Sequence, residues 1–172
     1  QTETKENPLP KNSERLSFGL PDQEAKVAKP VTAIVIGAGA RGNTYAKYSA
    51  QFSKSLNIVG VADPNPIRRE QMAQAYGIAP EHQFADWTDV FKQAKFADAV
   101  IIATPDNLHY KPCMRALEVG YDVLLEKPIA QTAKECKDIL RQARKYGRIV
   151  GVCHVLRYAP YFRALKRVVD LI

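Results

Sequence analysis

Short, almost continuously apolar runs alternate along this chain with longer stretches in which apolar residues recur at helical spacing. The first run, residues 31–36, is rich in β-branched side chains and ends in glycines. Four later runs resemble it, at residues 58–62, 99–103, 122–125 and 149–152. A parallel strand that helices cover on both faces needs such unbroken hydrophobicity, so each run predicts a buried strand. A short segment around Phe84 is a candidate for a further strand.

Helical patterns occupy the intervals between these runs, near residues 42–52, 67–76, 88–93, 108–119, 130–146 and 160–171. Alternation of strand and helix is typical of βαβ units, whose crossovers are almost always right-handed. We therefore predict an α/β fold with a doubly wound parallel sheet.

The strand–helix pattern starts only after a polar leader, residues 1–30, which holds four prolines and many charges. We expect this leader to act as a tail or linker. Residues 31–153 then form one domain, for which a chain of 172 residues is long enough. The chain opens at Gln1 rather than Met, which indicates processing or trimming. We expect a cytoplasmic protein, and the polar leader leaves a periplasmic or exported one as the alternative.

A glycine turn directly follows the first predicted strand and opens the first predicted helix. In this turn Gly37 permits a tight bend, Gly39 lets a diphosphate approach the main chain, and Gly42 lets helix and strand pack closely. Free N–H groups at the start of a helix bind anions. The turn therefore predicts a Rossmann-type dinucleotide-binding domain, and its remaining residues, Ala40 and Arg41, are expected at the nucleotide as well.

A carboxylate stands where such a domain needs one, because Asp63 follows the second strand about 20 residues after the last glycine. It is expected to accept the adenosine ribose hydroxyls and to repel a 2′-phosphate, so NAD is favoured over NADP. The nearby Arg68 and Arg69 keep NADP open, since an arginine accommodates that phosphate. Alternatively, Asp63 only caps the turn before Pro64.

The net charge of +7 raises the question of a nucleic-acid partner. The basic residues are spread along the chain among acids, and their one cluster falls in a helical pattern beside Glu135 and Asp138. That cluster comprises Lys134, Lys137, Arg141, Arg144 and Lys145. We interpret it as a solvated helix face and expect no nucleic-acid partner.

Two other classes of site find no support in the sequence. No apolar run approaches the roughly 20 residues that a membrane span requires, so we expect none. The three cysteines are scattered and the three histidines form no H-E-x-x-H motif, so we expect no metal site.

Two further motifs lie in the second half of the chain. Thr104-Pro105-Asp106-Asn107-Leu108-His109 follows the run at 99–103, and Glu126-Lys127-Pro128 follows the run at 122–125. With the G-x-G-x-R-G turn, these T-P-x-x-x-H and E-K-P segments resemble the Gfo/Idh/MocA family, named for glucose–fructose oxidoreductase and inositol dehydrogenase. The resemblance runs from about Thr32 to the end of the chain, and it implies an NAD(P)-dependent oxidoreductase.

The resemblance implies roles for the strand-end residues. Lys127 matches the catalytic lysine that points at the substrate hydroxyl beside the nicotinamide. Glu126 and Pro128 would fix its place at the cofactor, through a Lys127–Pro128 bond expected to be cis. A cation there stabilises the alkoxide that develops as an alcohol is oxidised. The plain alternative is an exposed strand-end lysine paired with Glu126.

The resemblance also implies roles for residues near the nicotinamide half of the cofactor groove. Thr104, Pro105 and Asn107 match residues lining the nicotinamide half of the cofactor groove, and His109 would cap the following helix near it. A purely structural His109 is the favoured alternative to a catalytic one.

The last part of the chain is expected to lead towards the substrate site. Arg157 matches a family segment that leads from the last strand towards the substrate. For His154, a place at the edge of the core and a place in the site are both open. Tyr158 and Tyr161 are expected to pack on neighbours. Residues 154–172 would begin the connection to the family's second, α+β domain. The resemblance implies that this domain supplies the general base and forms the usual homo-oligomer.

Three functions remain open at this point. The leading one transfers hydride between a nicotinamide and a secondary alcohol of a sugar or polyol, with this chain as the nucleotide-binding fragment. The second is an NAD-dependent glycosidase or lyase that oxidises the sugar transiently, a branch whose turn also ends in Arg-Gly, as Arg41-Gly42 does here. The third is a non-enzymatic NAD-binding regulator, against which the complete E-K-P triplet argues.

Overall fold

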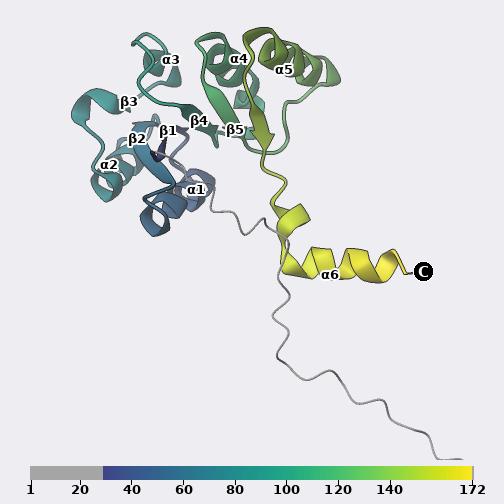
Figure 1. Cartoon of the computed structure of the whole chain (residues 1–172). Coiled ribbons are helices and arrows are strands. Elements are labelled where there is room, and N and C mark those ends of the chain that lie inside the picture. Colours follow the sequence, from purple (N-terminus) through teal and green to yellow (C-terminus); the bar gives the residue numbers. More distant parts are fainter. Residues whose placement is uncertain (1–28, 172) are drawn as a thin grey trace, which may run out of the picture.

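A computed structural model describes residues 29–171, in which a six-stranded sheet lies between helices (Figure 1). All neighbouring strands are parallel and follow the order β3-β2-β1-β4-β5-β6. Their bounds are β1 Val31–Ile36, β2 Leu56–Ala62, β3 Gln83–Phe84, β4 Ala99–Ile102, β5 Asp122–Leu125 and β6 Val150–Val152. The predicted doubly wound parallel sheet is confirmed, including the short strand at Phe84. Residues 1–28 of the predicted leader lie outside the described residues.

Six α-helices connect or follow the strands. They are α1 Ala40–Gln51, α2 Pro66–Tyr76, α3 Trp87–Val90, α4 Tyr110–Glu118, α5 Ala133–Tyr146 and α6 Pro160–Val169. Short 3₁₀ turns occupy Pro80–His82, Asp106–Leu108 and Val155–Tyr158. Each helix falls within or close to a predicted helical stretch, although α3 is only one turn long.

The strand β1 explains why the apolar runs are unbroken. Its alternate side chains enter two different cores, with Ile34 and Ile36 in one and Ala33 and Val35 in the other. The first core includes residues of α3, α4 and α5, whereas the second includes residues of α1 and α2. Both faces of the sheet are thus covered, and a polar side chain at any of these positions would be buried.

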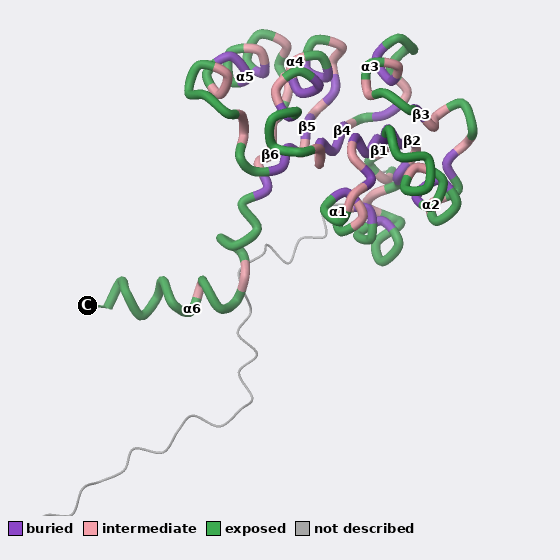
Figure 2. Tube along the Cα trace, turned by 180° about the vertical axis from the view of Figure 1, so that it is seen from behind, coloured by how far each residue is buried: buried purple, intermediate pink, exposed green. Residues whose placement is uncertain are grey.

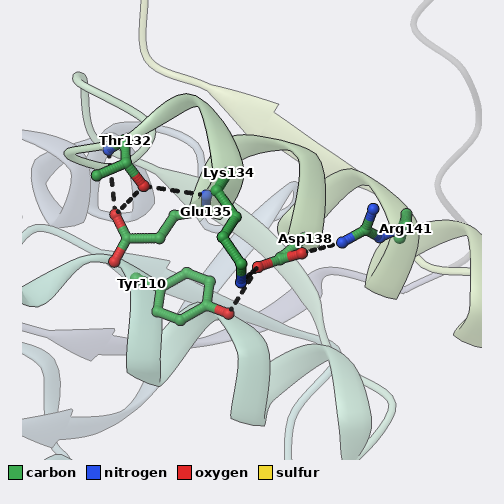
Figure 3. A network of polar contacts seen from close by, with 6 residues as sticks. All are labelled: Tyr110, Thr132, Lys134, Glu135, Asp138 and Arg141. Atoms are coloured by element: carbon green, nitrogen blue, oxygen red, sulfur yellow. Dashed lines mark hydrogen bonds and ion pairs between the residues drawn. The ribbon is translucent and has the colours of Figure 1, made fainter.

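The helix α5 begins with a capping box, visible in Figure 3. The Thr132 hydroxyl accepts from the Glu135 N–H at 3.2 Å, and the Glu135 carboxylate accepts from the Thr132 N–H at 3.1 Å. The helix ends at Gly147, whose φ of 60° places it in the left-handed region that favours glycine. These two signals fix the limits of the longest helix in the described part of the chain.

Two residues of the basic cluster on α5 form ion pairs with an acidic residue of the same helix. Lys134 and Arg141 both form ion pairs with Asp138 (Figure 3), and Asp138 is only 8% exposed. Their hydrogen bonds and charges lower the pKa of Asp138, the Lys134 contact having the largest effect. The Tyr110 hydroxyl of α4 also donates weakly to this carboxylate, at 3.4 Å. Asp138 thus links α5 to α4, while Lys134 and Arg141 remain largely exposed, as expected for a solvated helix face.

The helix α6 stands apart from the domain after β6 (Figures 1 and 2). The expected packing of Tyr158 and Tyr161 on neighbours is slight, since each residue is 70% exposed. Tyr161 makes only an edge contact with the adjacent ring of Phe162. The reason is that the chain leaves the sheet at this point, and α6 follows a path away from both cores. No helix within residues 29–171 has the length and apolar character needed to cross a membrane.

Candidate functional site

The glycine turn joins β1 to α1 through two very close contacts. Gly37 has a φ of +96°, and a Cβ there would lie 2.6 Å from the carbonyl oxygen of Ala103. A Cβ on Gly42 would lie 2.0 Å from the carbonyl oxygen of Gly37. Because both obstacles are main-chain atoms, only glycine fits at these two positions. The turn therefore packs directly against both the end of β4 and the first turn of α1.

Gly39 differs from these two glycines because open space surrounds it. A Cβ there would meet nothing within 4 Å, and its φ of −73° is available to any residue. It also precedes a helix with no side-chain cap and no acidic residue in its first turn. The first N–H groups of α1 thus have no side-chain acceptor, and the first turn of the helix carries no acidic residue of its own. An anionic diphosphate fits this arrangement.

Asp63 joins the end of β2 to this turn. Its carboxylate accepts from the Ala38 N–H at 2.7 Å and from the Asn65 N–H at 2.8 Å, and the residue is 5% exposed. The second bond closes the turn around Pro64, so the capping role considered for Asp63 is present. The first bond places its negative charge beside the glycine turn. Arg69 donates to the main-chain oxygen of Asp63 at 2.7 Å.

The segment after β4 forms the opposite side of the site. Thr104 adjoins Gly37 through its main chain, and the exposed Pro105 and Asn107 follow it, Pro105 just before the 3₁₀ turn and Asn107 within it. The Thr104 hydroxyl is the one buried side-chain polar atom without a partner in the described part of the chain. A buried hydroxyl without a partner is costly, which makes this position a candidate for contact with a ligand.

His109 is fully buried beneath this segment. One ring nitrogen lies 2.6 Å from the Pro128 carbonyl oxygen and the other lies 3.0 Å from that of Thr104. His109 is the N-cap residue of α4, which agrees with its predicted position at the start of this helix, but its side chain makes no capping bond. The physical reason is that the ring points towards the strand ends, where it joins the two segments that follow β4 and β5. The burial of His109 and its two carbonyl contacts agree with the structural alternative for this residue.

Glu126 follows β5 and is only 4% exposed. Its Oε1 accepts from the Arg41 Nε at 2.6 Å and from the Tyr45 hydroxyl at 2.5 Å. Its Oε2 accepts from the Lys127 N–H at 2.8 Å. Tyr45 belongs to α1 and was not foreseen from the sequence. The only signal was its position four residues after Arg41, which puts both on one helix face.

Lys127 is exposed beside this buried carboxylate. The side chain that pairs with Glu126 is that of Arg41, so the alternative of a Lys127–Glu126 side-chain pair is wrong. The amine of Lys127 forms no ion pair or hydrogen bond with residues 29–171. The Lys127–Pro128 peptide bond is cis, as the resemblance implied.

The protonation states of this cluster follow from its contacts. Burial alone would raise the pKa of Glu126, but hydrogen bonds from Tyr45, Arg41 and the Lys127 N–H outweigh it and lower that pKa. Burial and the neighbouring Cys153 and Glu126 raise the pKa of the Tyr45 hydroxyl well above its ordinary value. At neutral pH the carboxylate is therefore charged and the tyrosine remains a donor.

Acid should remove the stability that Glu126 provides. Because its folded pKa is lowered, this contribution is present above the ordinary pKa of 4.5 and is lost as pH falls through the folded value. We expect Glu126→Gln to lower the free energy of unfolding by roughly 2 kcal/mol at pH 7. Urea unfolding should show this difference shrinking towards pH 3.

The control is Glu118→Gln, since Glu118 forms only an exposed pair with Arg115. It should change stability little at any pH. A Glu126→Gln difference that stayed constant from pH 7 to pH 3 would contradict the assignment.

Two remaining predicted residues lie away from this cluster. Arg157 is exposed on the 3₁₀ turn after β6, and His154 is exposed just before it. No side-chain hydrogen bond or ion pair joins either of them to the other candidate residues in the portion that the structure describes. That portion also holds no group of three or more His, Cys, Asp or Glu side chains placed to bind a metal ion.

Comparison with known proteins agrees with this geometry. The inositol 2-dehydrogenase of Klebsiella pneumoniae subsp. pneumoniae is 33% identical over 79% of this chain and 40% of its own length. The scyllo-inositol 2-dehydrogenase (NAD(+)) of Bacillus subtilis is 31% identical over 81% of the chain and 40% of its own length. The chain thus spans about 40% of the length of these curated relatives.

A solved structure has the same fold and a bound dinucleotide. It is an inositol dehydrogenase homolog from Azotobacter vinelandii, complexed with NADH and myo-inositol, with a TM-score of 0.66 and 27% identity. The match covers 73% of this chain and 35% of that one. Residues 31–154 match the model of the oxidoreductase family with an NAD-binding Rossmann fold. The match begins with β1 and ends just after β6, and the chain belongs to the Gfo/Idh/MocA oxidoreductase family.

Proposed function

We propose that this chain is the nucleotide-binding part of an NAD-dependent oxidoreductase that acts on a secondary alcohol of a sugar or polyol. The observation that carries the proposal is the placement of Lys127. Its main chain is fixed by the buried Glu126, and its amine is left free of ion pairs within residues 29–171. The inositol dehydrogenases among the relatives support this substrate class.

The proposed chemistry needs a positive charge at the substrate hydroxyl. When bound, the nicotinamide supplies the hydride acceptor. Lys127 stabilises the developing alkoxide, because an ammonium placed where negative charge appears lowers the barrier. Arg41 neutralises Glu126 in the same cluster, so the charge of Lys127 is not cancelled by its immediate neighbour. Thr104 and Asn107 would orient the nicotinamide end from the segment after β4.

The proposed preference for NAD depends on Asp63. Its buried carboxylate lies at the glycine turn, where it would accept the ribose hydroxyls and repel a 2′-phosphate. Arg69 donates to the main-chain oxygen of Asp63, so one of the two arginines that could accommodate a 2′-phosphate already has a partner. Arg68 remains exposed on α2.

The rest of the proposed enzyme lies beyond the domain. Since the relatives are longer than this chain, we propose that residues 154–172 begin a connection to a substrate domain. Arg157 would face the substrate from this connection. The general base and the contacts of a homo-oligomer would come from the second domain. A cytoplasmic location stays a prediction, with export as its alternative.

Turnover by the longer protein tests this proposal. It should form NADH from NAD with at least one member of a panel of sugars and polyols, measured by NADH absorbance. The isolated chain should bind NAD in calorimetry and turn over little. Robust turnover by the chain alone, or none by the longer protein, would contradict the proposal. Glycoside cleavage without net NADH would instead favour the glycosidase alternative.

A further inference from the structure

Glu126 connects two parts of the site that are far apart in sequence. Two of its donors, Arg41 and Tyr45, come from α1, the helix that opens at the glycine turn. Both bind Oε1, which leaves Oε2 for the main-chain N–H of Lys127. The carboxylate is thus a bridge between α1 and the segment that carries the lysine.

The α1 side of this bridge is well defined. Arg41 and Tyr45 lie one helical turn apart, and the guanidinium carbon lies 5.7 Å from the centre of the tyrosine ring. Burial raises the pKa of the Tyr45 hydroxyl, so it stays protonated and donates at 2.5 Å. The Arg41 side chain is 44% exposed, whereas that of Glu126 is 5% exposed. Tyr45 is only partly exposed, so it is the better shielded of the two donors.

A second contact fixes the same segment from another direction. The ring of His109 lies 2.6 Å from the carbonyl oxygen of Pro128. The residues on either side of Lys127 are therefore both held, Glu126 by α1 and Pro128 by His109. The side chain of Lys127, which lies between them, is exposed.

We infer that Tyr45 and Arg41 are positioning residues that set the place of Lys127 through Glu126. This inference rests on the proposed oxidoreductase function. Neither residue needs to touch the substrate. Their effect is exerted through a carboxylate whose other oxygen holds the lysine's own N–H. Loss of one donor should let the segment shift, and a shift of about 1 Å at a reacting group costs up to roughly 100-fold in rate.

The test is a double-mutant cycle between Tyr45→Phe and Lys127→Ala in the longer protein. Tyr45→Phe removes the donor and keeps the ring, and it should lower kcat roughly ten-fold or more. In the Lys127→Ala background the same change should have almost no further effect on kcat. A purely structural role would instead lower kcat equally in both backgrounds and would overturn the inference.

A binding measurement on the isolated chain supplies a second readout. NADH and ADP-ribose differ in the nicotinamide end, where Lys127 is proposed to act. Tyr45→Phe should weaken NADH binding several-fold while ADP-ribose binding stays within two-fold of the wild type. Equal weakening of both ligands, or of neither, would count against the inference.

The controls separate this inference from the proposed function. Tyr48→Phe changes an exposed tyrosine of the same helix, whose ring lies tilted against that of Phe52, and should leave kcat unchanged. Arg41→Gln should repeat the Tyr45→Phe result, and Arg41→Lys should restore part of the lost rate. A wild-type enzyme that forms no NADH refutes the proposed function, whereas an active wild type with a fully active Tyr45→Phe variant refutes only the inference.

Discussion

Replacement of Gly42 by alanine should lower the free energy of unfolding by about 3 kcal/mol or abolish folding. The added methyl carbon would lie 2.0 Å from the carbonyl oxygen of Gly37 and 3.1 Å from a methyl carbon of Val35. Relief requires moving the main chain of the turn away from the first turn of α1. Urea unfolding followed by circular dichroism measures the loss directly.

The matched control is Gly39→Ala in the same turn. Its methyl group would enter open space at an ordinary φ of −73°, so stability should stay close to that of the wild type. NAD binding should nevertheless weaken at least about ten-fold, roughly 1.4 kcal/mol, because the methyl group occupies the approach to the helix N–H groups. Wild-type stability for Gly42→Ala, or wild-type NAD affinity for Gly39→Ala, would contradict this account of the turn.

Lys127→Ala in the longer protein should lower kcat by roughly 10²–10³-fold, the usual cost of removing a group that stabilises a developing oxyanion. The change should leave the fold intact, since the lysine side chain is exposed and forms no ion pair within residues 29–171. Steady-state formation of NADH is the measurement, with melting temperature as a check on folding.

Lys111→Ala provides the comparison for this variant. Lys111 is an exposed lysine on α4, and its removal should leave turnover unchanged. If Lys127→Ala kept every activity of the wild type, the protein would be better described as a non-enzymatic NAD-binding regulator.

The sheet was predictable because burial on both faces leaves a direct mark on the sequence. The run at residues 31–36 coincides with β1, and its alternate side chains do enter two separate cores. Helix limits were less exact. The helical pattern near 108–119 begins in the structure as α4 at Tyr110, because a 3₁₀ turn at Asp106–Leu108 comes first.

Parts of the site were predictable to different degrees. The glycine turn and Asp63 follow from local spacing, since each role is fixed within one βαβ unit. The Tyr45–Glu126 bond joins residues 81 apart in sequence, and no spacing rule connects them. The structural alternative for His109 agrees with its burial, but its contacts with Thr104 and Pro128 were not predictable, because they depend on how the ends of β4 and β5 meet.

The strand order has a consequence for how this domain can evolve. The strands β1 and β4 are neighbours, yet α1, which follows β1, packs on one face and α4, which follows β4, packs on the other. Because the connections after β1 and β4 leave towards opposite faces of the sheet, a crevice forms between them at the carboxyl ends of these two strands. The location of binding is thereby inherited from the topology, while substitutions in the loops are free to alter which molecule is accepted there.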